Sequence, residues 1–364
     1  MRKGVANCFA LFLVAVSVTS VSETIQAMPV YAVTDLGAGV QPYAINDHGD
    51  VVGTNEHGRA FVWNSGVMSD LGTLGGPTSI AFDVNSRGAI VGESTTERAW
   101  VSNGFVRTST TMNPVPTLGL GFGQDRWTPL AINHTGQMAG SLGRSAVYYD
   151  GLLVHDIGSA LGFDNSIAVG INSLGQVAGA ANSTFGYWNQ AFVYNPATQS
   201  ATMIAPLPGL GSNRATAIND AGVVVGTSYD NGFPGTQRGF VYSEGTSIPL
   251  TPYLSQPTSI NNAGQIVGYA DDPSTHRTGL FLSDLGRVTF WDDLIAPDSG
   301  WSMSAAMGAY DINNQGQIVG IGNFGHEQHG FVLTPVGLPP VVEGPPSKLT
   351  LARLSDDVSN MGTG

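Results

Sequence analysis

Two histidines near the end of the sequence have a spacing that suits metal binding. His326 and His329 bring two imidazoles three residues apart, with Glu327 between them. A zinc site needs three or four protein ligands, and this pair lies in a Gly-rich segment instead of on a helix. We therefore expect neither a metal nor another cofactor.

Two pairs of adjacent acids have the chemistry of glycoside cleavage. Asp271 and Asp272 form one pair, and Asp292 and Asp293 form the other. Cleavage requires two carboxyl groups roughly 5 to 9 Å apart on either side of the bond. Neighbouring acids in a loop are more commonly solvated charges, and no Ser, His and Asp set with a nucleophile motif accompanies them. We assign no catalytic residue.

A third group combines aromatic rings with arginine and histidine, which suit sugar rings or a protein partner. These residues lie in segments that differ in length and chemistry between the repeats of this chain, where function on a rigid scaffold is usually found. Packing of the loops explains the same aromatics, so both interpretations stay open. The candidate ligand-binding residues are Arg98, Arg126, Trp127, Tyr187, Trp188, Tyr229, Arg238, Arg277, Trp301, His326 and His329.

A short pattern that recurs seven times must position these groups. In the copy at Ile218 it reads Ile-Asn-Asp-Ala-Gly-Val-Val-Val-Gly. We expect the Asn side chain to bond to backbone groups ahead of it and the first Gly to take the positive φ of a tight β-hairpin. The apolar residues that follow then form the return strand. The copies begin at Ile45, Val84, Ile132, Ile171, Ile218, Ile260 and Ile312.

An aromatic strand follows each hairpin, and a short turn then leads to a fourth strand with an Asp-Leu-Gly type of ending, as at 70–72. One unit is therefore a four-stranded meander with a period of about 39 to 52 residues. This period fits a propeller blade and is too long for a β-helix rung. The aromatic strands are expected at 60–63, 99–101, 146–149, 191–194, 239–242, 279–282 and 330–333.

The ends of the repeat region indicate whether the array is closed. The first three strands occur seven times, but only six copies are followed by a fourth strand. The missing strand is present on the N-terminal side, at 31–37. We predict an all-β fold, a seven-bladed β-propeller of four-stranded antiparallel blades in which this N-terminal strand completes the last blade. Closure removes the exposed sheet edges of the alternative, an open stack.

Composition indicates an exported protein. Arg2 and Lys3 precede the apolar run at 8–16, so residues 1–27 are interpreted as a secretory signal peptide. We expect a secreted, extracellular protein, with the periplasm as a second possibility. The run is too short to span a bilayer and nothing later is long enough, so no integral membrane span is expected. Residues 28–335 would form the propeller, and 336–364 a Pro-rich linker and a mobile C-terminal tail.

Charge and cysteine content argue against several further functions and structural features. The formal net charge is −13, and no lysine lies between Met28 and Ser347. Such a chain cannot neutralise a run of phosphates, so nucleic acid is not expected as a partner. Cys8 is the only cysteine and lies in the expected signal peptide, which leaves no disulfide and no thiol nucleophile. Charged residues are 11% of the chain against about 25% in a typical domain, which indicates sheets covered on both faces. We expect a monomer.

The Asn-x-x-Gly-x-Val-Val-Gly hairpin, the Ala-Phe-Val-Trp strand at 60–63 and the Asp-Leu-Gly-Thr-Leu-Gly-Gly run at 70–76 resemble the bacterial extracellular repeat family known as HAF, named for His-Ala-Phe. The resemblance covers nearly all of residues 30–335. The tripeptide itself is altered to Arg-Ala-Phe at 59–61, Gln-Ala-Phe at 190–192 and His-Gly-Phe at 329–331. The resemblance implies export and a repeat β fold, and it transfers no activity, substrate or catalytic residue.

In a ring of such meanders the two faces differ. The loops between second and third strands share one face with the connections between blades, and we call this the loop face. The Asn hairpins lie on the opposite face, which we call the hairpin face. We predict a binding or structural module that engages an extracellular glycan or protein with its loop face. The alternative is an extracellular polysaccharide hydrolase or lyase with its site on that face or in the central channel.

Overall fold

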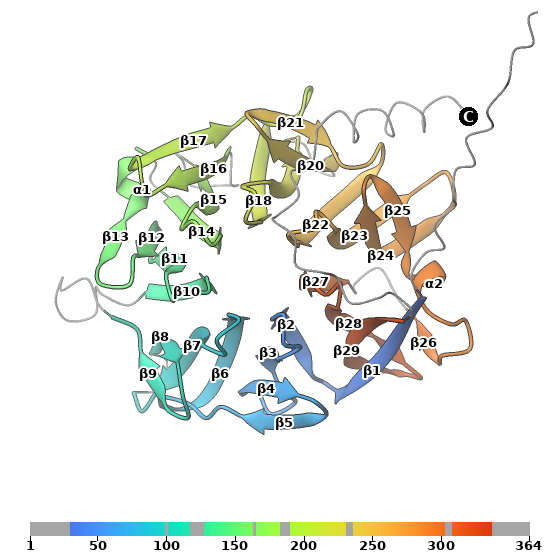
Figure 1. Ribbon diagram of the computed structural model, residues 1–364, viewed down its shortest axis with the longest axis horizontal. Coiled ribbons are helices and arrows are strands. Elements are labelled where there is room, and N and C mark those ends of the chain that lie inside the picture. The colour runs from blue at the N-terminus through green and yellow to red at the C-terminus, as the bar shows by residue number, and fades with distance from the viewer. Residues whose placement is uncertain are drawn as a thin grey trace, which may run out of the picture.

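The computed structural model shows seven antiparallel sheets arranged as blades in a closed ring (Figure 1). It describes residues 30–98, 101–116, 127–162, 165–182, 190–230, 236–302 and 308–336. The chain is a seven-bladed β-propeller, as predicted. The expected signal peptide and the tail after residue 336 lie outside the described residues.

The first strand of each blade faces the centre of the ring and the fourth lies at the perimeter (Figure 1). The first blade consists of β2 (Gln41–Ile45), β3 (Val51–Thr54), β4 (Ala60–Asn64) and β5 (Val67–Asp70). The second consists of β6 (Gly75–Val84), β7 (Ile90–Thr96), β8 (Ser102–Arg107) and β9 (Met112–Pro114). The third consists of β10 (Trp127–Ile132), β11 (Met138–Leu142), β12 (Ser145–Tyr149) and β13 (Val154–Asp156).

The next three blades repeat this order. The fourth consists of β14 (Asn165–Ile171), β15 (Val177–Asn182), β16 (Gln190–Asn195) and β17 (Ser200–Ile204). The fifth consists of β18 (Ser212–Ile218), β19 (Val224–Tyr229), β20 (Gln237–Ser243) and β21 (Thr246–Pro249). The sixth consists of β22 (Leu254–Ile260), β23 (Ile266–Asp272), β24 (Arg277–Asp284) and β25 (Arg287–Phe290).

The seventh blade joins the two ends of the described chain. It contains β26 (Trp301–Ser302), β27 (Ala309–Ile312), β28 (Ile318–Phe324) and β29 (Glu327–Val336), and β1 (Val30–Ala38) pairs with β29 as its outermost strand. Val33 lies opposite Leu333 in this pairing. The predicted closure by the N-terminal strand is therefore confirmed, and Figure 1 shows β1 beside the strands of this blade.

Two one-turn helices interrupt the connections between blades. They are α1 (Ile157–Ala160), after β13, and α2 (Trp291–Leu294), after β25. The Oδ1 atom of Asp156 accepts a hydrogen bond of 3.1 Å from the Ser159 N–H and so caps α1. In the part of the chain that the structure describes, no helix has the length and apolar character needed to cross a membrane.

The third strand of the second blade differs from the prediction. It is β8, which begins at Ser102, whereas the sequence pattern placed it at 99–101. Phe105 lies opposite Gly92 in the sheet, as Phe61 lies opposite Gly53 in the first blade. The sequence pattern indicates Trp100 as the aromatic residue of the repeat, but Phe105 is the fully buried ring of this blade. Residues 99 and 100 lie outside the described residues.

The two glycines of each repeat are required for different reasons. Gly222 has φ of +78°, a conformation that favours glycine and that reverses the hairpin. Gly226 lies under the ring of Phe240, and a Cβ there would be 2.1 Å from the Arg214 carbonyl oxygen and 2.7 Å from the Phe240 ring. The second glycine is therefore required by the close approach of an aromatic ring and a neighbouring strand.

The hydrophobic core of the described chain is divided into seven clusters. Each cluster lies between two neighbouring blades. Between the last and first blades, for example, Phe61 packs with Val51, Val319 and Val332. Burial of these apolar faces is what holds one blade to the next. Stability therefore resides between blades as much as within them.

A closed circle of hydrogen bonds joins the blades around the centre. The Asn of every hairpin is buried, and its Nδ2 donates to the backbone carbonyl of the Asn in the next blade at 2.8–3.2 Å. Its Oδ1 accepts from two backbone N–H groups of its own hairpin; for Asn219 these belong to Ala221 and Val223. The donors, in order, are Asn46, Asn85, Asn133, Asn172, Asn219, Asn261 and Asn313, which donates back to Asn46. We call this circle the asparagine ring.

Replacing one member of the asparagine ring is expected to destabilise the whole propeller. The substitution Asn219→Ala removes acceptors from two N–H groups of the hairpin and a donor to the Asn261 carbonyl. We expect a loss of about 2–4 kcal/mol in the free energy of unfolding, because buried groups lose their partners. Denaturant unfolding followed by circular dichroism measures this loss.

Asn195→Ala is the matched control. Asn195 accepts a hydrogen bond from the Ala197 N–H in an exposed turn. Its replacement should cost less than about 1 kcal/mol. Equal costs for the two variants would contradict a special role for the bonds between blades.

Candidate functional site

Three rings meet at the loop face of the last blade. The ring centroid of Trp301 lies 5.3 Å from that of Phe324 and 6.1 Å from that of His329, and the last two are 5.6 Å apart. The inner edge of this blade is divided, since β26 and β27 both pair with β28, and Trp301 is thereby placed opposite Phe324. Phe324 is 42% exposed, and Trp301 is half-buried. We call these three residues the aromatic platform.

The aromatic platform is held from two sides. Trp301 contacts the buried ring of Phe331 edge-on, with 5.9 Å between centroids. His329 Nδ1 lies 2.9 Å from Oδ1 of Asp35 on β1, and its Nε2 lies 3.9 Å from Oε2 of Glu327. Asp35 and His329 become neighbours through the pairing of β1 with β29. The contact between Asp35 and His329 therefore depends on closure of the ring.

The structure brings together some of the residues that the sequence predicted for ligand binding. Trp301 and His329 belong to the aromatic platform, and His326 is exposed in the turn between Phe324 and Glu327. Asp35 and Glu327 were missed as partners of His329.

Other predicted residues lie on different blades. Arg277 is on the sixth blade, where its Nη1 donates to Oδ2 of Asp293 at 2.7 Å and its guanidinium carbon lies 5.1 Å from the centroid of Phe290. Tyr229 and Arg238 lie on paired strands of the fifth blade. Arg98 is exposed on the second. The described residues of the set are therefore not gathered into one site.

Trp127 is a correction to the prediction. It is fully buried, and its Nε1 donates to the Pro116 carbonyl at 2.7 Å. The indole packs in the core cluster between the second and third blades. It is thus unavailable to a ligand. Arg126, Tyr187 and Trp188 lie outside the described residues.

Each of the two acid pairs has a member engaged in local structure. Asp272 accepts from the Ser274 hydroxyl at 2.6 Å and from the Thr275 hydroxyl at 2.8 Å. Burial raises the pKa of Asp272, but these hydrogen bonds outweigh it and lower the pKa overall. Asp293 is paired with Arg277. Within the described ranges, no group of three or more His, Cys, Asp or Glu side chains is arranged to hold a metal ion.

A second candidate site is the central channel, which contains a cavity of about 320 Å³. All seven blades contribute residues to it from their first strands. Each of these strands carries a β-bulge two residues before the hairpin Ile or Val. A bulge changes the direction in which a side chain points. The bulged residues, which line the cavity, are Tyr43, Phe82, Leu130, Val169, Thr216, Thr258 and Tyr310.

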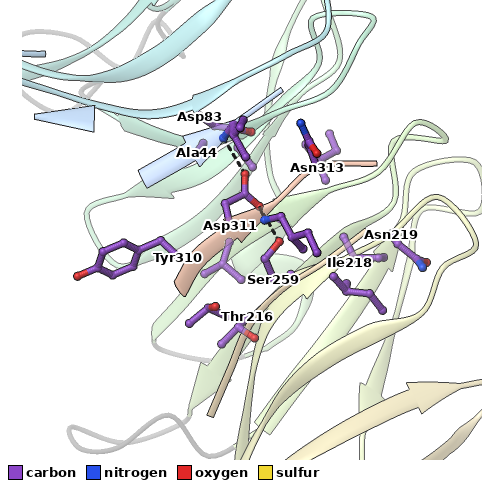
Figure 2. A pocket seen from close by; sticks show the side chains of 18 of the residues that line it. Ala44, Asp83, Thr216, Ile218, Asn219, Ser259, Tyr310, Asp311 and Asn313 are labelled. Carbon is purple, nitrogen blue, oxygen red and sulfur yellow. Dashed lines mark hydrogen bonds between the residues drawn. The ribbon is translucent and has the colours of Figure 1, made fainter. Parts of the chain in front are cut away.

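Two aspartates in the channel wall connect neighbouring blades. Asp311 accepts from the Ile45 N–H of the first blade at 2.9 Å and from the Ser259 hydroxyl of the sixth at 2.6 Å. Figure 2 shows Asp311 between Ser259 and Ala44, with the Tyr310 ring directed away from it. Asp83 likewise accepts from the Ile132 N–H of the third blade at 2.7 Å.

Burial changes the titration of both wall aspartates. It raises the pKa of Asp83 to about 7; the hydrogen bond from the Ile132 N–H opposes this shift and the charge of Asp311 adds to it. Burial also raises the pKa of Asp311. The wall therefore carries carboxyl groups whose proton affinity depends on their place between blades.

Comparisons with known proteins assign no family to the chain. No family model matches the chain, and no curated protein matches it. Among solved structures, the β-propeller domain of the Trilobed protease from Pyrococcus furiosus is 11% identical, with a TM-score of 0.44 over 73% of this chain and 84% of that one.

A gluconolactonase from Xanthomonas campestris is 11% identical, with a TM-score of 0.38 over 85% of this chain and 91% of that one. An oligogalacturonate lyase in complex with manganese is 11% identical, with a TM-score of 0.36 over 79% of this chain and 74% of that one. Likeness at this level carries no argument about activity. The described blades themselves define the chain as a member of the propeller class.

Replacing Asp83 by Asn is expected to reduce the pH dependence of the melting temperature. The pKa of Asp83 is about 7 in the folded chain and about 4 in an unfolded one, so the folded state binds the proton more tightly. The stability contributed by this proton is complete below about pH 4 and is lost as the pH rises through about 7. Between about pH 5 and about pH 8 the wild type should lose on the order of 5 °C that Asp83→Asn does not lose. Differential scanning calorimetry measures this difference.

Asp272→Asn is the control for this experiment. The pKa of Asp272 is lowered, so its charge stays constant over the same interval. The variant should lose stability at every pH and keep the wild-type slope. If Asp83→Asn also keeps that slope, the carboxyl of Asp83 is not the titrating group.

Proposed function

We propose that the chain is a secreted binding module that engages an extracellular glycan with the loop face of its propeller. The observation that supports this function is the aromatic platform of Trp301, Phe324 and His329. Its rings are in mutual contact, and Phe324 is partly open to solvent. The resemblance to HAF repeats and the signal-like N-terminus support an extracellular location.

The chemistry beside the platform favours a sugar over a second protein. A pyranose ring has an apolar face that stacks on an aromatic side chain and hydroxyl groups that donate to carboxylates. Asp35 and Glu327 place carboxylates next to His329. A stable protein interface needs about 800 Å² on each partner with a larger apolar centre than three rings provide. A protein partner is therefore the second candidate ligand for the same surface.

The platform is also rigid, which favours binding. Trp301 and Phe324 lie opposite one another on paired strands, and Trp301 contacts the core residue Phe331. Little conformational entropy is lost when a ligand covers rings that are already ordered. Of the paired acids that would support a hydrolase or lyase, Asp272 accepts from Ser274 and Thr275. Asp293 accepts from Arg277. We therefore propose binding without catalysis.

Alanine at Trp301 or Phe324 is expected to weaken retention on extracellular polysaccharides. Each substitution removes a stacking face, and we expect about a tenfold loss of affinity from a loss of about 1–1.5 kcal/mol. Affinity electrophoresis in gels that contain a panel of soluble polysaccharides measures the retention. Melting temperature checks that each variant is folded.

Leu174→Ala is the control variant, since Leu174 is 70% exposed in an Asn hairpin on the opposite face. It should be retained like the wild type. Equal retention of all variants would discard the aromatic platform as the binding surface. Retention of the wild type by immobilised proteins but by no polysaccharide would favour the protein partner.

A further inference from the structure

The central cavity is lined at two levels along the channel. Its middle is lined by the bulged residues, and its rim on the hairpin face includes Asp47, Asp220, Asn262 and Asn314. These rim residues come from the first, fifth, sixth and seventh blades. The cavity therefore reaches the hairpin face, which is opposite the aromatic platform. With about 320 Å³ it lies at the lower end of the size range of small-molecule sites.

An arc of three aromatic rings occupies one side of this cavity. The Tyr43 ring centroid lies 5.8 Å from that of Tyr310 and 6.3 Å from that of Phe82. The three residues occupy the same bulge position in three adjoining blades. Across the channel the same position holds Thr216 and Thr258, whose smaller side chains leave the space open. A ligand in the cavity would therefore contact aromatic rings on one side.

Several side-chain donors that line the cavity are hydrogen-bonded within the protein. Nδ2 of Asn262 donates to Oδ2 of Asp220 at 2.7 Å, and Nδ2 of Asn314 donates to Oδ2 of Asp47 at 2.9 Å. The hydroxyls of Thr216 and Thr258 donate to backbone carbonyls of the following blades. These amide and hydroxyl donors are therefore engaged within the protein and do not offer hydrogen bonds to an anion.

Charge in the cavity has one sign. Among the described residues, those lining it include no lysine, arginine or histidine, and its rim carries the carboxylates of Asp47 and Asp220. None of the ion pairs in the described ranges involves Asp47, Asp83, Asp220 or Asp311. A cleft lined by one sign of charge concentrates ligands of the opposite sign. An anion is excluded on the same ground.

We propose that the central cavity binds a small organic cation, an ammonium group on a compact apolar body, against the rings of Tyr43, Phe82 and Tyr310. Aromatic faces attract such cations through the ring quadrupole, and the attraction is strongest where water is displaced. The rim carboxylates of Asp47 and Asp220 favour the charged ligand over a neutral one at the mouth. This site is separate from the proposed glycan surface, because the two lie on opposite faces of the ring.

The test compares choline with its neutral isostere, in which a carbon atom replaces the ammonium nitrogen. Isothermal titration calorimetry on the full propeller should show binding of choline and at least about tenfold weaker binding of the isostere. Equal affinity for the two compounds would overturn the choice of a cation. No heat with choline at millimolar concentration would overturn the site.

Variants locate the site. Tyr310→Leu and Tyr43→Leu should each weaken choline binding about tenfold, and Asp220→Asn by a smaller factor. Tyr149→Leu is the matched control, since Tyr149 is half-buried in the third blade and does not line the cavity. If the control weakens binding as much as the cavity variants, choline binds elsewhere. The comparison of choline with its isostere on the wild type keeps the proposal testable if a variant does not fold.

Discussion

The asparagine ring is the constraint on which the rest of this structure depends. Each Asn satisfies its own hairpin through Oδ1 and reaches the next blade through Nδ2, as Asn219 does toward Asn261. The Nδ2 donor in one blade must therefore lie within hydrogen-bonding distance of the Asn carbonyl in the next blade. That spacing fixes the angle between blades, and the angle sets how wide the central channel is. The bulged residues then project into a space whose size the ring has already determined.

Most of the fold could be predicted because each repeat carries its turn chemistry in adjacent residues. The hairpin glycine at Gly222 and the N-terminal fourth strand are both readable from local pattern and from counting. The third strand of the second blade was misplaced because an aromatic residue, Trp100, stands near the expected position. What distinguishes Phe105 is burial over Gly92, and burial depends on the neighbouring blade. Local spacing carries no record of such contacts between blades.

The candidate sites were predicted less completely for the same reason. Trp301 and His329 stood out as aromatic and ionisable residues in variable loops, whereas Asp35 meets His329 through a pairing between the two ends of the chain. Asp83 and Asp311 occupy a position that holds Ala, Gly or Ser in the other repeats, so an alignment of the repeats marks them as exceptions. Their partners are backbone N–H groups of other blades, and a backbone group has no signature in a sequence.

The pairing of β1 with β29 also affects the order in which strands can pair during folding. Val30 lies opposite Val336, so β1 finds its partner strand only after the described strands between them, β2 to β28, have been synthesised. Until then β1 has no partner strand within the blade, and unpaired strand edges are sites where another chain can pair. Contacts between such distant parts of a chain form slowly, because a long loop must close before they contribute. Assembly of this propeller therefore has a vulnerable interval that lasts until its final strand arrives, and a chaperone that covers β1 would shorten the risk without touching the finished ring.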